Sequence, residues 1–137
     1  MLRGALIKGA PKTKQPRPTD AELEILRVLW NRGPSTVRDV YEELKRDKDV
    51  GYTTVLKFMQ IMVEKGLLNR DESQMKHVYS AAQEENKTKS MLLDRFIESI
   101  YNGSASSLMM QLLGNKKTSK KELDAIRELL NKMEKKK

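Results

Sequence analysis

Residues 52–79 constrain the fold most, because a helical pattern, a glycine and a hairpin pattern follow one another there. At about 100° per residue, one face of the predicted helix collects Tyr52, Val55, Met59, Met62 and Val63. The opposite face collects Thr53, Thr54, Lys57, Gln60 and Ile61. Gly66 suits the helix end, and the polar residues 69–76 before His77-Val78-Tyr79 predict a hairpin. The segment is typical of a recognition helix followed by a wing.

Two further helices are predicted upstream of this segment. Thr19 followed by Glu22 is a capping-box pattern, which predicts a helix over residues 20–32. Ser35 or Thr36 caps a second helix, whose apolar residues recur at helical spacing up to Leu44. The short connection at residues 50–51 makes the second and third helices neighbours. The sequence therefore predicts a winged helix-turn-helix over residues 19–82, mainly α with a small β-wing.

The charge of the chain favours an anionic partner. The sequence holds 27 Lys and Arg against 19 Asp and Glu, a formal net charge of +8. Nucleic acid or an anionic membrane surface, each a polyanion, fits this charge better than an acidic ligand or a neutral substrate does. No segment approaches the roughly 18 apolar residues of a membrane span, so no membrane insertion is expected. The absence of cysteine is compatible with a reducing compartment, and we expect a cytoplasmic protein.

Residues 1–18 predict a basic, disordered arm. Its first 17 residues carry five Lys and Arg and no carboxylate, and prolines at positions 11, 16 and 18 interrupt any helix. An arm that reaches into the minor groove of DNA is the alternative.

Residues 83–137 predict a helical dimerisation region. A polar join over 83–89 precedes helices expected at 90–101, around 108–113 and from Ser119 onward. Their candidate dimerisation residues are Leu92, Leu93, Phe96, Ile97, Ile100, Leu108, Leu112, Leu123, Ile126 and Leu130. These apolar faces follow a complete small domain, so a second copy of the chain is the expected cover. Two-fold symmetric proteins gain specificity by binding two half-sites. The alternative is that the helices fold back onto the first domain.

The outward face of the third helix carries the candidate DNA contacts. Thr53 and Thr54, in the first turn, can meet phosphate oxygens. Lys57 and Gln60 can reach guanine and adenine edges. The other candidates are Ile61, which offers a thymine methyl an apolar contact, and Arg70, Lys76 and His77 in the wing. The alternative for each residue is a solvated surface position.

Catalysis finds little support in the sequence. His77 is the single histidine, so one chain cannot build a multi-histidine metal site. The sequence contains no Gly-rich phosphate loop. We expect no enzyme activity, no metal and no cofactor.

The chain resembles the penicillinase repressor family over residues 18–132. The resemblance is carried by PTDAELEILRVLWNRGPSTVRDVYEEL, YTTVLKFMQIMVEKGLLNR and SMLLDRFIESIYNGSASSLMMQLL. It implies an N-terminal winged helix, a C-terminal helical dimerisation region and repression at a palindromic operator of resistance genes. It also implies induction through a membrane sensor protease pathway, with the cut placed at Gln111-Leu112 by spacing from Tyr101.

The chain departs from the family pattern at three places. Ile61 stands where the family often has Arg, which alters the expected operator preference. Gln111-Leu112 replaces the Asn-Phe pair at which the resistance repressors are cut. The copper-responsive branch has C-terminal cysteines, and this chain has none.

The sequence thus predicts a homodimeric, sequence-specific repressor that binds double-stranded operator DNA. Two alternatives remain: a protein-interaction scaffold that uses the winged helix, and a basic protein that binds DNA without sequence preference.

Overall fold

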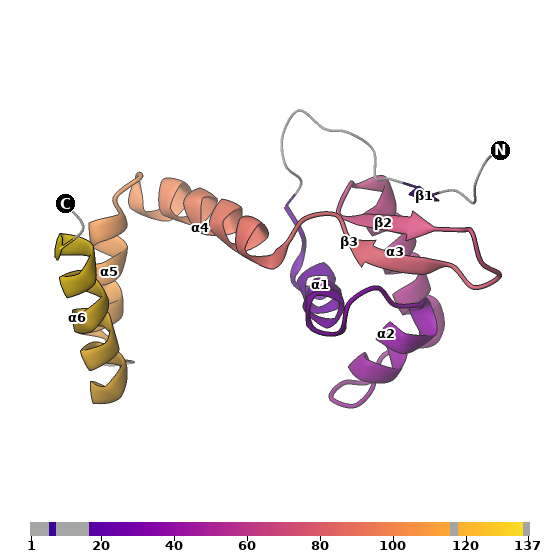
Figure 1. The fold of residues 1–137 in the computed structure, drawn as a ribbon, viewed down its shortest axis with the longest axis horizontal. Helices are drawn as coiled ribbons and strands as arrows, with labels where there is room; N and C mark the ends of the chain where they lie inside the picture. The colour runs from indigo at the N-terminus through magenta and orange to yellow at the C-terminus, as the bar shows by residue number, and fades with distance from the viewer. Residues whose placement is uncertain (1–5, 8–16, 116–117, 136–137) are drawn as a thin grey trace. The chain divides into compact units, whose positions relative to one another are not determined.

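The computed structural model describes residues 6–7, 17–115 and 118–135, which form two compact units, Met1–Ser90 and Met91–Lys137 (Figure 1). The elements of the first unit are β1 (Leu6–Ile7), α1 (Asp20–Arg32), α2 (Val37–Leu44), α3 (Tyr52–Glu64), β2 (Leu68–Asp71) and β3 (Val78–Ala81). Helix α4 (Glu85–Tyr101) begins in the first unit, and α5 (Ala105–Gly114) and α6 (Lys120–Lys135) belong to the second. The predicted fold class, mainly α with a small β-wing, is confirmed.

Both upstream helices begin at capping boxes. In α1, Thr19 Oγ1 accepts from the backbone N–H of Glu22 at 3.2 Å, and Glu22 Oε1 accepts from the N–H of Thr19 at 2.9 Å. In α2 the cap is Thr36 rather than Ser35, and Thr36 and Asp39 exchange the same two bonds at 3.1 Å. These bonds satisfy donors that would otherwise remain free in the first turn. The predicted bounds of the first helix, 20–32, are confirmed.

The three helices and the hairpin share one core. Its buried apolar residues are Ile25, Leu26, Leu29, Val37, Val40, Val55, Met59, Met62, Val63, Leu67, Leu68 and Tyr79. Four of the five apolar residues predicted for α3 are among them. Tyr52 is the exception: it is 39% exposed, because it is the first residue of α3, and its ring packs edge-on against Tyr41 at 5.8 Å.

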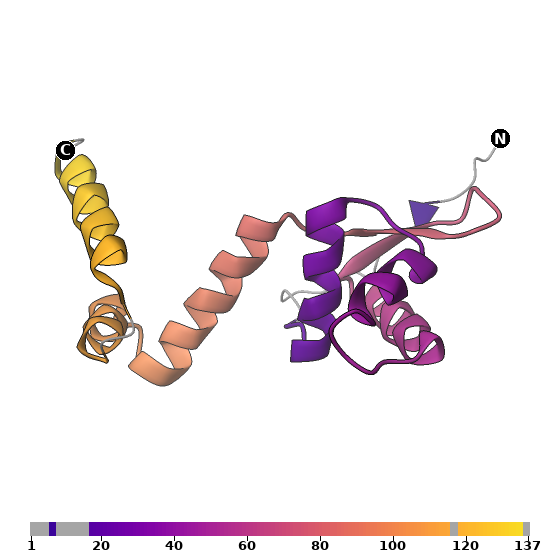
Figure 2. The ribbon, with the colours of Figure 1, turned by 90° about the horizontal axis from the view of Figure 1, so that it is seen from below.

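The wing is an antiparallel hairpin in which Leu68 pairs with Ala81 and Asp71 with Val78. Helices α2 and α3 lie on one side of it (Figure 2). The backbones of Ser35 and Tyr79 exchange hydrogen bonds of 2.9 and 2.7 Å. The hairpin is therefore tied to the loop between α1 and α2.

Leu6 and Ile7 differ from the predicted disordered arm. They form β1, which pairs antiparallel with Asp71 and Arg70 of β2. The outer edge of β2 has backbone donors and acceptors that a passing chain can pair with, and no sequence pattern signals this pairing. Residues 1–5 and 8–16 of the predicted arm lie outside the described residues.

One buried ion pair joins the start of α1 to the end of α3. Lys65 Nζ lies 2.6 Å from Glu22 Oε1, and the exposed fraction is 4% for the Glu22 side chain and 30% for the Lys65 side chain. The same carboxylate oxygen accepts the capping bond from Thr19. Burial of a carboxylate is costly unless it is paired and hydrogen-bonded, and Glu22 meets both conditions.

Helix α4 begins five residues earlier than predicted. Gln83 links two elements: its carbonyl oxygen accepts from Trp30 Nε1 at 3.0 Å, and its Oε1 accepts from Thr88 Oγ1 at 3.1 Å. Thr88 is 3% exposed. These contacts place the first turns of α4 in the first unit, so the two units divide after Ser90 rather than after residue 82.

The second unit buries little of its apolar surface. None of the described residues in 91–115 and 118–135 is buried. The predicted dimerisation residues Leu93, Phe96, Ile100, Leu112 and Leu130 are 40–60% exposed: 49%, 46%, 60%, 51% and 49%. The others (Leu92, Ile97, Leu108, Leu123 and Ile126) are half-buried. Within the described part of the chain, no helix is long and apolar enough to cross a membrane.

We predict that Lys65→Met destabilises the first unit by about 2 kcal/mol, because it leaves the Glu22 carboxylate buried without a countercharge. Glu22→Gln should cost less, since Gln also closes a capping box and Lys65 can turn toward water. Urea unfolding followed by the fluorescence of Trp30, the single tryptophan, measures both effects. The double variant should be more stable than the sum of the single losses implies, and strict additivity would contradict the coupling.

We also predict that stability falls in acid partly through Asp39. The hydrogen bond from the Thr36 backbone lowers the pKa of Asp39, with smaller contributions from the Thr36 hydroxyl, Arg32 and Lys76. Since the folded pKa lies below the unfolded one, this stabilisation is complete above the unfolded pKa and is lost as pH falls through the folded pKa. The free energy of unfolding of Asp39→Asn should therefore approach that of the wild type between about pH 5 and pH 3. A constant difference across this range would exclude the contribution.

Candidate nucleic-acid interface

The outward face of α3 is polar and exposed. Thr53, Thr54, Lys57 and Gln60 are all exposed on it. The opposite face of the same helix is buried in the core. The structure therefore brings four of the five candidates on α3 together on one accessible surface. The fifth, Ile61, is half-buried and offers only part of its side chain.

The start of α3 is open to an anion. Its cap is Gly51, which supplies no side-chain hydrogen bond, and its first turn contains no acidic residue. Beyond Gly51 and its two chain neighbours, no described heavy atom lies within 4 Å of the position that a Cβ on Gly51 would occupy. The first backbone N–H groups of a helix lack intrahelical partners and carry partial positive charge. The N–H groups at the N-terminus of α3, beside Thr53 and Thr54, can thus donate to a phosphate oxygen.

The wing supplies Lys, His and Arg side chains that differ in exposure and in whether they are already paired. Lys76 and His77 are exposed at the hairpin tip. Arg70 on β2 is half-buried, and its Nε donates to Glu72 Oε2 at 2.7 Å. Burial lowers the pKa of Arg70, but interactions with Tyr79 and Glu72 outweigh it, so the pKa lies above its ordinary value. Arg70 is charged but already paired, whereas the hairpin tip presents its side chains to solvent.

A concavity of about 350 Å³ lies between the wing tip, the start of α2 and the start of α3. It is lined by Thr36, Val37, Arg38, Tyr52, Leu56, Met75, Lys76, His77 and Tyr79. The guanidinium of Arg38 lies 5.1 Å from the ring centroid of Tyr52 and 5.8 Å from that of Tyr41. Acidic residues follow Arg38 on α2, and its side chain is exposed and paired with Glu42. Its spacing of three residues from Tyr41 was the available signal of an aromatic contact.

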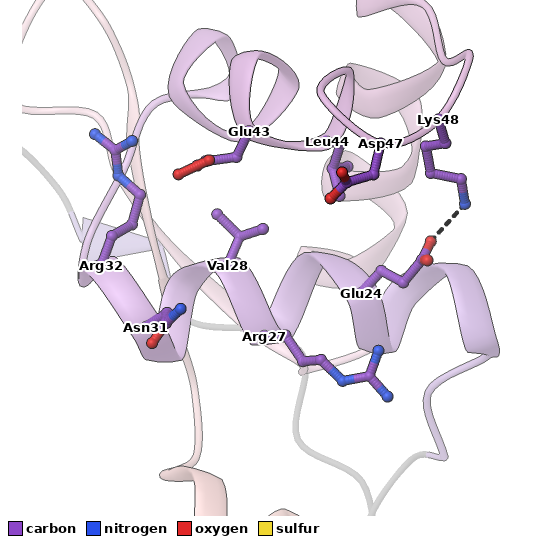
Figure 3. Close-up of a pocket in the computed structure, with 9 residues that line it drawn as sticks. All are labelled: Glu24, Arg27, Val28, Asn31, Arg32, Glu43, Leu44, Asp47 and Lys48. Atoms are coloured by element: carbon purple, nitrogen blue, oxygen red, sulfur yellow. Dashed lines mark hydrogen bonds and ion pairs between the residues drawn. The ribbon is translucent and has the colours of Figure 1, made fainter.

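A second concavity, of about 420 Å³, lies between α1 and the end of α2 (Figure 3). Its charged lining residues are Glu24, Arg27, Arg32, Glu43, Asp47 and Lys48. Glu24 and Lys48 form an ion pair of 2.6 Å within it. Its lining holds three acidic and three basic residues, so it offers a polyanion no uniformly positive surface. The candidate interface is accordingly the side formed by α3 and the wing tip.

The described part of the chain contains no cluster of metal-ligating residues. Residues 6–7, 17–115 and 118–135 include no group of three or more His, Cys, Asp or Glu side chains that could hold a metal ion. His77 lines the concavity beside Lys76, and no second imidazole can join it within one chain.

Comparison with known proteins shows the family of this chain. The model of the penicillinase repressor family matches residues 18–132. A penicillinase repressor of Staphylococcus aureus is 24% identical over 123 residues, which cover 90% of this chain and 98% of the relative. A penicillinase repressor of Bacillus licheniformis is 26% identical over 117 residues, covering 85% of this chain and 91% of the relative. The methicillin resistance regulatory protein MecI of Staphylococcus aureus is 25% identical over 114 residues, covering 83% and 93% respectively. The match spans both units of the structure, and the chain belongs to the penicillinase repressor family.

Proposed function

We propose that this protein is a DNA-binding transcriptional repressor that acts as a homodimer on a two-fold symmetric operator. The observation that carries the proposal is the division of α3 into a buried apolar face and an exposed polar face, with an uncapped N-terminus. The names of the relatives, penicillinase repressor and methicillin resistance regulatory protein, support control of β-lactam resistance or related genes. Such a regulator acts on DNA in the cytoplasm and needs no catalytic centre.

Different residues of α3 bind the DNA backbone and the base edges. Thr53 and Thr54 bind phosphate oxygens at the N-terminus of the helix and so fix its register on the duplex. Lys57 and Gln60, one and two turns further on, read base edges in the major groove. Ile61 contributes at most a narrow apolar contact with a thymine methyl group, because it is half-buried.

The wing binds the DNA backbone beside the major groove. Lys76 and His77 are exposed at its tip and can approach phosphates or the minor groove. Arg70 has a secondary part, because Glu72 already accepts from its Nε. This contact pattern orients the recognition helix without adding much sequence information.

The second unit supports the homodimer. Its three helices expose large apolar side chains, and none of its described residues is buried. Exposed apolar surface of this kind marks an interaction site. A second copy of the same unit covers it with a self-complementary surface, as two-fold symmetric dimers require. The dimer then places two recognition helices on two half-sites of the operator.

A proteolytic inducing step at Gln111-Leu112 stays part of the proposal. Both residues are exposed, but they lie within α5, and the carbonyl oxygen of Gln111 accepts from the N–H of Asn115 at 3.1 Å. A protease, reached through a membrane sensor pathway, must therefore unwind the end of α5 before it cuts. The cut would separate α6 from the rest of the shared interface and weaken the dimer. Mass spectrometry that finds only full-length protein in induced cells would reject this step.

We predict that the protein selects a two-fold symmetric motif from a pool of random duplexes at near-physiological salt. Thr54→Ala/Lys57→Ala should fail to select it, because it loses both a phosphate contact and a base contact. Lys87→Ala, which removes an exposed charge from the first turn of α4, is the matched control and should select the same motif. If no motif emerges and all three proteins bind alike, the protein is a scaffold or a non-specific binder.

We predict that Phe96→Asp/Ile100→Asp converts the protein to a monomer, because it places charges within the apolar interface. Affinity for the complete operator should then fall to that for a half-site. Sedimentation measures the oligomeric state, and titration of each duplex measures the affinity. Ser99→Asp, at an exposed position on the same helix, should remain dimeric. A dimer that survives the double substitution would place the interface elsewhere.

A further inference from the structure

We propose that Arg38 on α2 joins Lys76 and His77 at the wing tip to hold one backbone phosphate of the DNA in the concavity between wing, α2 and α3. The inference rests on the proposed function. It adds to the recognition helix a positioning site whose central residue lies outside that helix.

The guanidinium of Arg38 is held in place by aromatic rings. It lies 5.1 Å from the centroid of Tyr52 and 5.8 Å from that of Tyr41, and the two rings pack against each other at 5.8 Å with planes at 80°. Arg stacks on aromatic faces while its planar N–H groups continue to donate. Two ring contacts restrict the side chain without consuming its donors.

Arg38 keeps donors available for a ligand. One nitrogen lies 3.5 Å from Glu42 Oε2, and the side chain is 62% exposed. A guanidinium has five N–H donors, so this single ion pair leaves most of them. Glu42 also accepts from Lys45 at 3.2 Å, which satisfies its carboxylate independently of Arg38. An arriving phosphate can therefore replace Glu42 as the partner of Arg38 without stranding a charge.

The surrounding concavity carries positive charge from Arg38 and Lys76. Arg38, Lys76 and His77 all line it, together with the hydroxyl-bearing residues Thr36 and Tyr52. Neither Asp nor Glu is among the described residues that line it. Asp39 interacts with Lys76, and its pKa is lowered chiefly by the Thr36 backbone hydrogen bond and slightly by the charge of Lys76. Asp39 is engaged by the capping bonds of α2 and by Arg32 at 3.7 Å. Its charge is thus largely offset within the protein, and the concavity can accept an anion.

The position of the concavity indicates which anion it accepts. Tyr52 lines it and directly precedes Thr53 and Thr54, whose side chains are exposed at the open N-terminus of α3. A DNA strand whose phosphate meets that N-terminus can continue past Arg38 toward the wing tip. Arg, helix N-termini and wings contact phosphates in this manner, and such contacts fix register rather than sequence. Arg38 is therefore a positioning residue for α3.

The test compares Arg38→Ala, Arg38→Lys and a matched control on the operator that the wild type selects. The control is Arg46→Ala: Arg46 also pairs with a glutamate, Glu43, at 3.3 Å, but it does not line the concavity. Arg38→Ala should weaken binding by about tenfold or more. The slope of log affinity against log salt should become shallower by about 0.9 for each protomer. Arg38→Lys should keep the slope and bind more weakly than the wild type, because Lys lacks the planar fork.

Replacing single phosphates of the operator by neutral methylphosphonates locates the contact. The wild type and Arg46→Ala should each lose affinity at one particular position in each half-site, and Arg38→Ala should be insensitive there but sensitive elsewhere. A wild-type salt slope and a wild-type methylphosphonate pattern in Arg38→Ala would overturn the inference. Unfolding followed by Trp30 fluorescence checks that the variants keep their fold.

A third arm separates DNA from a free anion, since both offer the same phosphate chemistry. Titration of DNA-free protein with inorganic phosphate at constant ionic strength should give no saturable binding. Saturation that Arg38→Ala abolishes, without any methylphosphonate effect, would assign the concavity to a free anion and overturn the inference. If the wild type selects no operator at all, the proposed function itself fails. An operator bound equally by Arg38→Ala and the wild type contradicts only the role of Arg38.

Discussion

The rest of the structure depends on the buried carboxylate of Glu22, whose interactions place α3 against α1. It closes the capping box that starts α1, and the same oxygen lies 2.6 Å from Lys65 Nζ, directly after the last residue of α3. One side chain therefore caps the start of α1 and pairs with the residue that follows α3. Because the carboxylate is buried, displacement of either partner leaves an expensive unpaired group. The apolar core holds the helices together, and this ion pair restricts how α3 can slide or rotate against α1.

With α3 fixed, the distribution of charge decides what its free face can bind. The acidic residues of α1 and α2 are largely used in caps and ion pairs, such as Asp39 with Thr36 and Glu42 with Lys45. The first turn of α3 has neither an acidic residue nor a side-chain cap. The positive end of the helix dipole is thus exposed where the fold has removed competing carboxylates. This arrangement favours a polyanion at α3, as the proposed function requires.

Local patterns predicted the elements of the first unit, whereas tertiary contacts decided the details that they missed. The capping box at Thr19 predicted the start of α1, and the Gly33-Pro34 pair predicted its end. The period of apolar residues identified the buried face of α3. The start of α4 depends on a bond from Trp30 to Gln83, 53 residues apart, and no local pattern contains it. Arg38 likewise has an aromatic contact, with Tyr52, that could not be seen in the local sequence. Its neighbours on α2 are acidic, but its aromatic partner Tyr52 belongs to another helix.

The two units differ in what stabilises them: the first has a buried core, and the second depends on association. This difference bears on regulation. The first unit has a complete core of its own, which keeps the shape of the proposed DNA-binding surface. The second has no buried residue in its described part, so its proposed apolar interface forms only when copies meet. Stability that comes from association depends on concentration. In the proposed dimer, loss of part of the second unit would therefore separate the two DNA-binding units without unfolding them, and affinity for the proposed operator would fall while each unit remained intact.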